Sequence, residues 1–191
     1  MQGFWLSFVP LFVAVDAVGI LPLFLGLTEA FSAAERRRVI SQSVLTATAV
    51  GLVFVLFGGG LLRLLGITVA DFMVAGGAML FVLSLVDLAS TRPRAERLDQ
   101  ADLGAVPLGI PLLAGPAVLT TSLLLVDQHG PWVTSTALLA NMLIAAGVLL
   151  FAGPIHRVLG STGTRIVQRV TLLLLAAIAI MTVRKGIEAF V

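Results

Sequence analysis

Long runs of apolar residues dominate the chain, and short polar stretches separate them. A helix that crosses a membrane needs about 20 mostly apolar residues. Six runs meet this requirement, at residues 4–28, 39–62, 68–89, 105–126, 133–155 and 166–187. Their apolar residues are continuous rather than alternating, which favours helices over barrel strands. The pattern predicts an all-α membrane protein with six transmembrane helices, three in each half of the chain.

Two polar stretches add detail to this prediction. Ser32 is followed three residues later by Glu35, which is typical of a capping box at the start of a helix. Residues 91–104 form the longest polar segment, and we expect a solvated cytoplasmic linker there. The chain is therefore expected to be a single membrane domain, with one three-helix repeat in 1–90 and a second in 105–191.

A short stretch that occurs twice supports this division. Residues 56–68 read LFGGGLLRLLGIT and residues 150–162 read LFAGPIHRVLGST, with seven of thirteen positions identical at an offset of 94 residues. Pro22 and Pro116 fall in register at the same offset. Because each half holds an odd number of helices, a second copy would enter the membrane inverted. Inverted repeats are typical of secondary transporters, although duplication is also a simple way to make a six-helix protein.

Composition narrows the class of protein. The chain has 59% hydrophobic and 12% charged residues, whereas a soluble domain carries about 25% charged residues. It lacks cysteine, which excludes disulfides and thiol nucleophiles. The net charge of +2 gives no basic patch, so no nucleic-acid partner is expected. No catalytic or metal-binding motif stands out, so we expect neither an enzyme nor a cofactor.

Basic residues predict the orientation in the membrane. Nine arginines fall on the face that carries the linker, at positions 36, 37, 38, 92, 94, 97, 157, 165 and 169. The opposite face carries Arg63, Arg184 and Lys185. This bias places the linker in the cytoplasm and both termini outside it.

The first predicted helix contains the sequence DAVGILP, from Asp16 to Pro22. A carboxylate in the middle of an apolar run costs several kcal/mol unless it is paired, protonated or exposed to water. Gly19 and Pro22 follow it and predict a kinked or broken helix. The break could serve packing alone, or Asp16 could bind a proton, a cation or an amino group.

The fourth predicted helix contains VPLGIPLLAGP, which cannot form an undisturbed helix. We expect a break or a re-entrant segment around Pro111–Pro116, with Gly115 inside it. Thr120 and Thr121 follow and could bond freed carbonyls or a polar ligand. Interruptions at matching places in two halves are typical of the substrate site of a transporter.

Among the remaining polar residues, Asn141 in the fifth predicted helix is the most costly to bury, and it requires an interhelical partner. It could be structural or contact a ligand. Gly76 and Gly77 in the third predicted helix favour a close approach between helices.

Three segments resemble the MarC family, also called UPF0056: DAVGILPLFLGLT, GITVADFMVAGGAMLF and VPLGIPLLAGPAVLTT. The resemblance covers nearly the whole chain in order and spacing. It implies six helices in a bacterial inner membrane, a relation to LysE-type amino-acid exporters, and transport of neutral amino acids. The family's helix 1 glycine and second proline match Gly19 and Pro22, and its helix 4 motif matches Pro111, Gly115 and Pro116. The family commonly has Asn-Pro where this chain has Asp16 and Ala17.

Together these features predict a secondary transporter of small neutral amino acids or similar metabolites that works by alternating access. Helix N-termini at the breaks would attract a substrate carboxylate, and Asp16 would bind the ammonium group or a coupling proton or cation. The expected partners are membrane lipids and a small-molecule substrate, and a homo-oligomer is left open. An ion channel and a non-transporting scaffold or sensor remain alternatives.

Overall fold

The computed structural model describes residues 2–28, 31–89, 109–110 and 112–189. Within these residues the regular structure is entirely helical, as predicted. The helices are α1 (Gln2–Val15), α2 (Ala17–Leu27), α3 (Ala33–Leu65), α4 (Val69–Ala89), α5 (Pro116–His129), α6 (Pro131–Leu150) and α7 (Ala152–Glu188). The predicted linker at 91–104 lies outside the described residues.

Four segments of the described chain are long and apolar enough to cross a membrane, at Gln2–Leu21, Ala33–Leu65, Val69–Val86 and Pro131–Leu150. The first of these includes α1 and the start of α2. Helix α5 has only 14 residues, whereas α7 has 37. The protein is therefore built from full-length helices combined with shorter ones that end inside the molecule.

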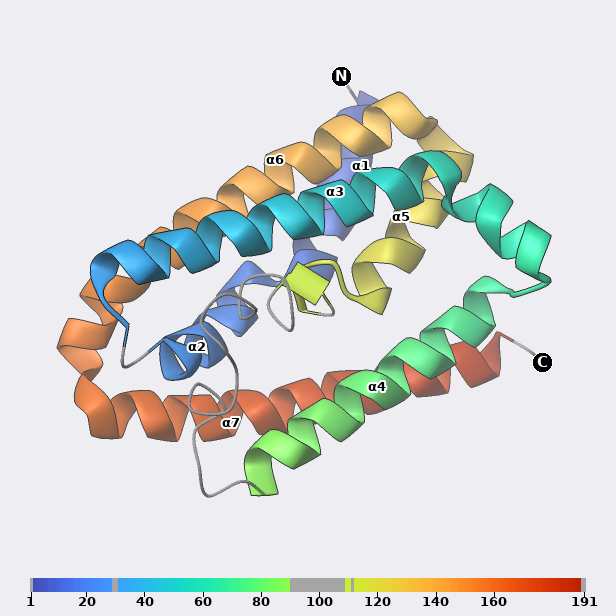
Figure 1. Ribbon diagram of the computed structural model, residues 1–191. Coiled ribbons are helices and arrows are strands. Elements are labelled where there is room, and N and C mark those ends of the chain that lie inside the picture. Colours follow the sequence, from blue (N-terminus) through green and yellow to red (C-terminus); the bar gives the residue numbers. More distant parts are fainter. Residues whose placement is uncertain (1, 29–30, 90–108, 111, 190–191) are drawn as a thin grey trace.

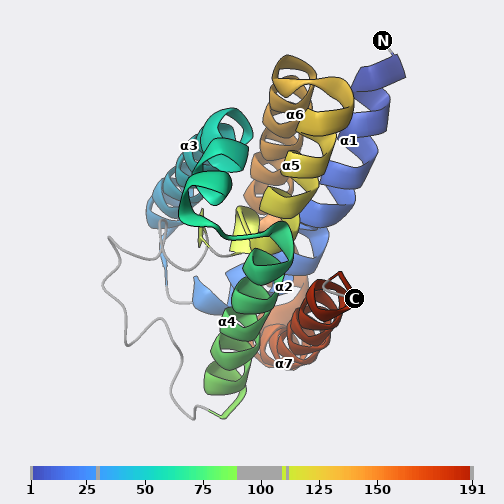
Figure 2. The same cartoon turned by 90° about the vertical axis from the view of Figure 1, so that its right-hand side faces the viewer.

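The helices form two layers (Figures 1 and 2). Helices α1, α3, α5 and α6 pack together in one layer, and α4 packs along α7 in the other. Helix α2 continues from α1 and contacts both α6 and α7. The two ends of the described chain and the α3–α4 and α5–α6 turns lie toward the same end of the molecule.

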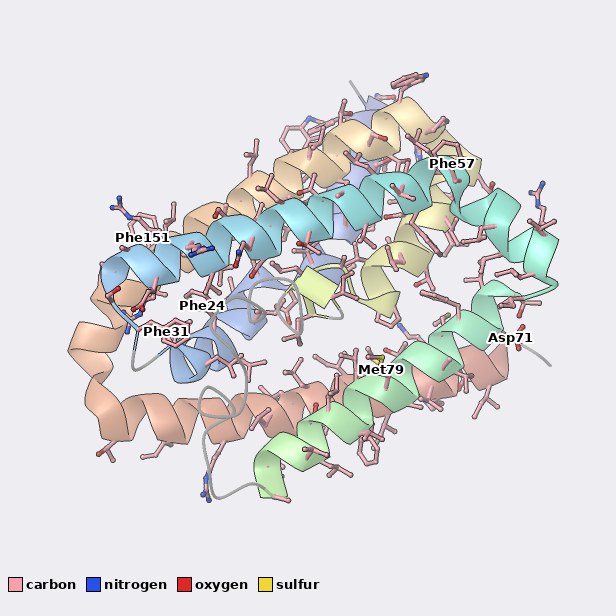
Figure 3. The ribbon with its side chains drawn as sticks, in the orientation of Figure 1. Phe24, Phe31, Phe57, Asp71, Met79 and Phe151 are labelled. Carbon is pink, nitrogen blue, oxygen red and sulfur yellow. The ribbon has the colours of Figure 1, made fainter. Side chains whose placement is uncertain are left out.

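The hydrophobic core lies mainly in the first layer and around α2. Phe24 of α2 is fully buried, and Phe31, which follows α2, is 8% exposed (Figure 3). Other fully buried side chains come from α1, α6 and the segment before α5, among them Leu11, Leu138 and Leu113. Large apolar side chains also cover the outside of the molecule, which suits a protein whose surroundings are apolar.

Helices α3 and α4 each begin at a side-chain cap. The predicted capping box is confirmed, because the Ser32 amide donates to Glu35 Oε2 at 2.7 Å and the Glu35 amide donates to Ser32 Oγ at 3.3 Å. Helix α3 consequently begins at Ala33, six residues before the apolar run that was predicted to form the helix. Asp71 plays the same part for α4, because its Oδ2 accepts from the Thr68 amide at 2.7 Å.

The two copies of the repeated stretch differ in their structure. In the first copy Gly66 has a left-handed backbone (φ 68°) and ends α3. The second copy begins at Leu150, the last residue of α6, and lies in α7 from Ala152 onwards, with Phe151 alone between the two helices (Figure 1). The predicted connection at 156–165 is therefore wrong, because this segment is helical. Phe57 and Phe151, which are equivalent in the two copies, are 66% and 68% exposed on the outside of the molecule (Figure 3).

Candidate functional site

The first interruption separates α1 from α2 at Asp16. The prediction of a broken first helix is confirmed, but its position is different. Pro22 lies inside α2, six residues after the junction. The break falls at Asp16 because this residue has a left-handed backbone, with φ 43° and ψ 50°. Aspartate tolerates this conformation better than most residues because its short side chain can bond to nearby backbone.

Gly19 completes this junction. The amide of Gly19 donates to Asp16 Oδ1 at 3.1 Å, so the carboxylate caps the first turn of α2. A Cβ atom added at Gly19 would lie 2.7 Å from Cγ of Asp16, which is closer than real Cβ atoms come. Glycine is therefore the residue that allows the carboxylate to sit over the helix end.

The second interruption precedes α5. The amide of Ala114 donates to the carbonyl of Gly109 at 2.9 Å, which closes a π-type turn of i to i+5 spacing. Gly115 is extended and Pro116 begins α5, where a proline costs no hydrogen bond. The predicted interruption is thus present. Pro111, which was expected to share in it, lies outside the described residues.

A cavity of about 600 Å³ lies between the two interruptions. Asp16 and its neighbours in α1 and α2 form one wall, and Gly115, Pro116, Ala117 and Thr121 form another. The third wall belongs to the second layer, through Leu80 of α4 and the α7 residues Leu175, Ile178, Met181, Thr182 and Lys185. The cavity therefore separates the α4–α7 layer from the layer that carries both breaks.

Backbone groups of both polarities line this cavity. The last carbonyls of a helix have no partner within the helix, and in α1 they belong to Val13, Ala14 and Val15, which all line the cavity. The amide of Ala117 lies in the first turn of α5, where the helix dipole favours negative charge. The α1 end therefore suits a cationic group, and the α5 start suits an anionic group.

Among the described residues, two charged side chains line the same cavity, Asp16 and Lys185. Reasoning from the sequence used Lys185 only to orient the chain and missed its position in the cavity. A usable signal was present, because Leu175, Ile178, Thr182 and Lys185 follow helical spacing along one face of α7. That signal requires knowing that residues 152–188 form one helix.

The remaining predicted site residues take different positions. Thr121 lines the cavity, whereas Thr120 is buried and its hydroxyl donates to the carbonyl of Ala117 at 3.2 Å. Asn141 is 2% exposed and is absent from the cavity wall. Its amide nitrogen donates to the carbonyls of Phe8 at 3.2 Å and Ala137 at 2.9 Å. Asn141 thus links α6 to α1, while its Oδ1 atom has no partner within the described chain.

Metal ligands do not gather at this site. Within the described residues, no group of three histidine, aspartate or glutamate side chains could hold a metal ion. The chemistry that the cavity offers is recognition of charge by one carboxylate, one amine and two helix ends.

Comparison with known proteins gives a match along the whole chain. Residues 1–191 match the family described as MarC family integral membrane protein. A UPF0056 membrane protein of Archaeoglobus fulgidus is 30% identical over 98% of this chain and 93% of its own length. UPF0056 membrane protein MJ0972 of Methanocaldococcus jannaschii is 33% identical over 95% of this chain and 85% of its own length. UPF0056 membrane protein YhcE of Escherichia coli is 27% identical over 95% and 90% respectively. No solved structure matches the chain.

Proposed function

Because this chain belongs to the MarC family of integral membrane proteins, we propose that it is a secondary transporter of small neutral amino acids or similar metabolites. The observation that carries the proposal is the cavity between the two helix interruptions. Transporters commonly bind their substrate where broken helices meet, since helix ends supply partial charges without a buried ion.

The walls of the cavity suit the two ends of an amino acid. The substrate ammonium group would bind between Asp16 and the last carbonyls of α1, which lie beside it in the chain. The substrate carboxylate would face the first turn of α5, at Ala117, with the Thr121 hydroxyl as a further polar contact. Asp16 would also be the group that exchanges a coupling proton or cation, because it is the carboxylate in this wall.

Alternating access would follow from movement of the two layers. Among the described helices, α4 and α7 form the most extensive pair, so they would move as one body. A Cβ atom added at Gly76 of α4 would lie 2.6 Å from Cβ of Pro116, so α4 touches the second interruption directly. A shift of α4 would thereby reach the start of α5 and change access to the cavity.

An inverted repeat of six membrane crossings is part of the proposal. In this repeat, the first half consists of the α1–α2 unit, α3 and α4. Their counterparts in the second half would be α5 together with the segment before it, α6 and α7, in that order. In support, α3 packs on α6 and α4 on α7, with each pair running in opposite directions (Figure 1). Contacts between counterparts are what a two-fold axis passing between the halves would produce.

The setting is proposed on the same basis. The protein would lie in a bacterial inner membrane with both termini outside the cytoplasm, as the arginine bias indicates. Lipid would cover exposed apolar side chains that lie outside the cavity, such as Val53, Leu64 and Leu143. We propose transport rather than catalysis because the described residues of the cavity wall offer charge recognition and no paired nucleophile and base. A relation to LysE-type exporters and the oligomeric state remain predictions.

Uptake by proteoliposomes tests the function. The full chain is reconstituted, and uptake of labelled glycine and alanine is measured with and without a pH gradient. We expect saturable uptake that the gradient accelerates. Asp16→Asn keeps a side chain that can accept from Gly19 but removes the charge, so we expect it to abolish acceleration by the gradient. Asp127→Asn is the matched control, because Asp127 is exposed and lies outside this cavity.

Three results would contradict parts of the proposal. Gradient-driven uptake unchanged in Asp16→Asn would exclude the coupling role of that residue. Flux that rises linearly with substrate concentration would indicate a channel. Absence of flux for every neutral amino acid, in protein shown to be folded, would favour a scaffold or sensor.

A further inference from the structure

The amine of Lys185, which lines the same cavity as Asp16, points to a second binding group. We propose that Lys185 forms an anion subsite at the mouth of the cavity, which selects solutes that carry a carboxylate. The proposal rests on the proposed transport function only for the statement that the bound solute is then transported. Binding of a carboxylate at Lys185 can be tested without transport.

Lys185 lies where α7 leaves the cavity. The α7 residues that line the cavity extend from Leu175 to Lys185, and ten residues of helix rise about 15 Å. Lys185 stands three residues before the end of α7, on the side of the molecule that carries both chain ends. It is the only lysine in the sequence, and it is exposed. Among the α7 residues that line the cavity, Lys185 is therefore the one nearest the end of the helix.

The ammonium group of Lys185 is free to bind a ligand. The adjacent Arg184 pairs with Glu188 at 3.6 Å, whereas Lys185 has no ion-pair partner within the described chain. Two acidic side chains near the cavity and on α4 accept hydrogen bonds from their own neighbours. Asp71 of α4 accepts two hydrogen bonds from Thr68, and Asp16 accepts from Gly19. The ammonium group of Lys185 is therefore available to a carboxylate that enters from solution.

The two charges define the solute. Lys185 and the start of α5 attract a carboxylate, and Asp16 attracts an ammonium group, all within one cavity. A solute with a single positive charge would be repelled at the mouth, and one with a single negative charge would be repelled deeper inside. A zwitterion meets favourable charge at both places. The carboxylate would be held first by Lys185 and then by the α5 amides as the solute moves inward.

A different role for Lys185 predicts different behaviour. Lysines near the ends of membrane helices often extend to the lipid headgroups without contacting a solute. In that role, Lys185 and Arg184 would be interchangeable in their effect on ligand affinity. In the proposed role they differ, because Lys185 lines the cavity and Arg184 does not.

Equilibrium binding of labelled alanine to the full chain in detergent tests the subsite. We expect Lys185→Gln to weaken binding about three- to tenfold, as for loss of one partly exposed charge contact of about 1 kcal/mol. Arg184→Gln, which makes the same charge change at the next residue, should leave affinity within twofold of the wild-type value. Lys185→Arg should restore most of the affinity.

Competition between unlabelled ligands and labelled alanine shows which group of the ligand the subsite recognises. Alanine should displace the label from the wild-type protein much better than alaninamide, which lacks the carboxylate. This preference should shrink in Lys185→Gln and persist in Arg184→Gln. It should also weaken at high salt, because charges near water are screened.

The outcomes separate this proposal from the proposed transport. Equal alanine affinity in Lys185→Gln and wild-type protein would overturn the subsite, as would failure of the wild-type protein to bind alanine. Binding that depends on Lys185, without flux in proteoliposomes, would support the subsite and overturn transport. If Lys185→Gln does not fold, loss of the alanine preference in Lys185→Met, checked by its helical circular dichroism, decides the question.

Discussion

At the scale of single residues, Asp16 has two separate properties. Its backbone conformation ends α1, and its carboxylate both caps α2 and lines the cavity. A left-handed conformation costs about 1–2 kcal/mol for most residues, and a local hydrogen bond offsets part of this cost for aspartate. The same side chain therefore sets the position of the break and supplies charge to the site.

Gly19→Ala tests whether this junction controls binding. Alanine inside a helix is usually more favourable than glycine by about 1 kcal/mol. At Gly19, the added methyl group would displace the Asp16 carboxylate, so we expect weaker alanine binding and no gain in stability. Gly60→Ala is the control, because a Cβ atom there has nothing within 4 Å. Gly60→Ala should raise the unfolding free energy by about 0.5–1 kcal/mol, measured by denaturation in mild detergent. A gain of this size in Gly19→Ala would contradict the proposed contact.

Asn141 is predicted to stabilise the fold rather than to bind substrate. Its amide joins α6 to the Phe8 carbonyl of α1, and interhelical hydrogen bonds in membranes are worth about 0.6–1.7 kcal/mol. Asn141→Ala should therefore lower the unfolding free energy by about 1–2 kcal/mol, since a cavity is also left. Alanine affinity of the folded fraction should be unchanged. Ser43→Ala, which removes only a bond to the same helix at Val39, should cost less. A large loss of affinity in Asn141→Ala would assign it to the site.

At the scale of elements, glycines determine how closely α4 and α7 pack. A Cβ atom at Gly77 would lie 2.8 Å from the Ala179 carbonyl oxygen, and one at Gly186 would lie 2.9 Å from the Ala70 carbonyl oxygen. Backbone cannot yield as a flexible side chain can. Small residues at helix contacts in membranes allow this approach, and packing then stabilises the pair without a hydrophobic driving force.

Gly77→Ala should separate α4 from α7. Overpacking of a tight contact typically costs about 1–3 kcal/mol. We expect a loss of stability in this range and slower transport, because the two helices would no longer move as one body. Gly147→Ala in α6 is the control, since nothing lies within 4 Å of its added Cβ atom. Stability equal to that of the control would mean that the α4–α7 contact is looser than the structure shows.

At the scale of the whole molecule, the cavity lies between the two layers. Its lining residues differ from the exposed residues on the outside, which lipid would cover. Met79 of α4 is 52% exposed (Figure 3), and its neighbour Leu80 lines the cavity. On α7, Ile178 lines the cavity, whereas Ile180 is 54% exposed but lies outside it. Exposure alone therefore does not identify the residues that solute can reach.

Single cysteines separate these two environments, and the natural chain contains none. We expect Ile178→Cys to react with a charged, membrane-impermeant thiol reagent in proteoliposomes. Ile180→Cys should react slowly, despite its greater exposure, because lipid would cover it. Alanine should protect Ile178→Cys from reaction. Faster labelling of Ile180→Cys would show that the cavity is closed to water in the membrane.

Sequence alone determined the features that depend on local properties of the chain. The length of the apolar runs predicted membrane helices. The Ser32–Glu35 spacing predicted the start of a helix, and α3 does begin at Ala33. Proline and glycine content predicted two interruptions. Each of these conclusions depends on residues that are close together in sequence, so one chain was sufficient.

Only the tertiary structure decided where these features act. A helix that is apolar on every side does not reveal in its sequence which face packs against another helix. The cavity wall on α7 and the position of Lys185 were therefore not predictable. The break fell at Asp16 rather than near Pro22 because a capping carboxylate over Gly19 favoured the earlier position. Residues 156–165 became helix, although they separate two predicted helices in the sequence, and Asn141 donates to the Phe8 carbonyl across 133 residues. Contacts between distant segments decided these points, and local composition does not encode such contacts.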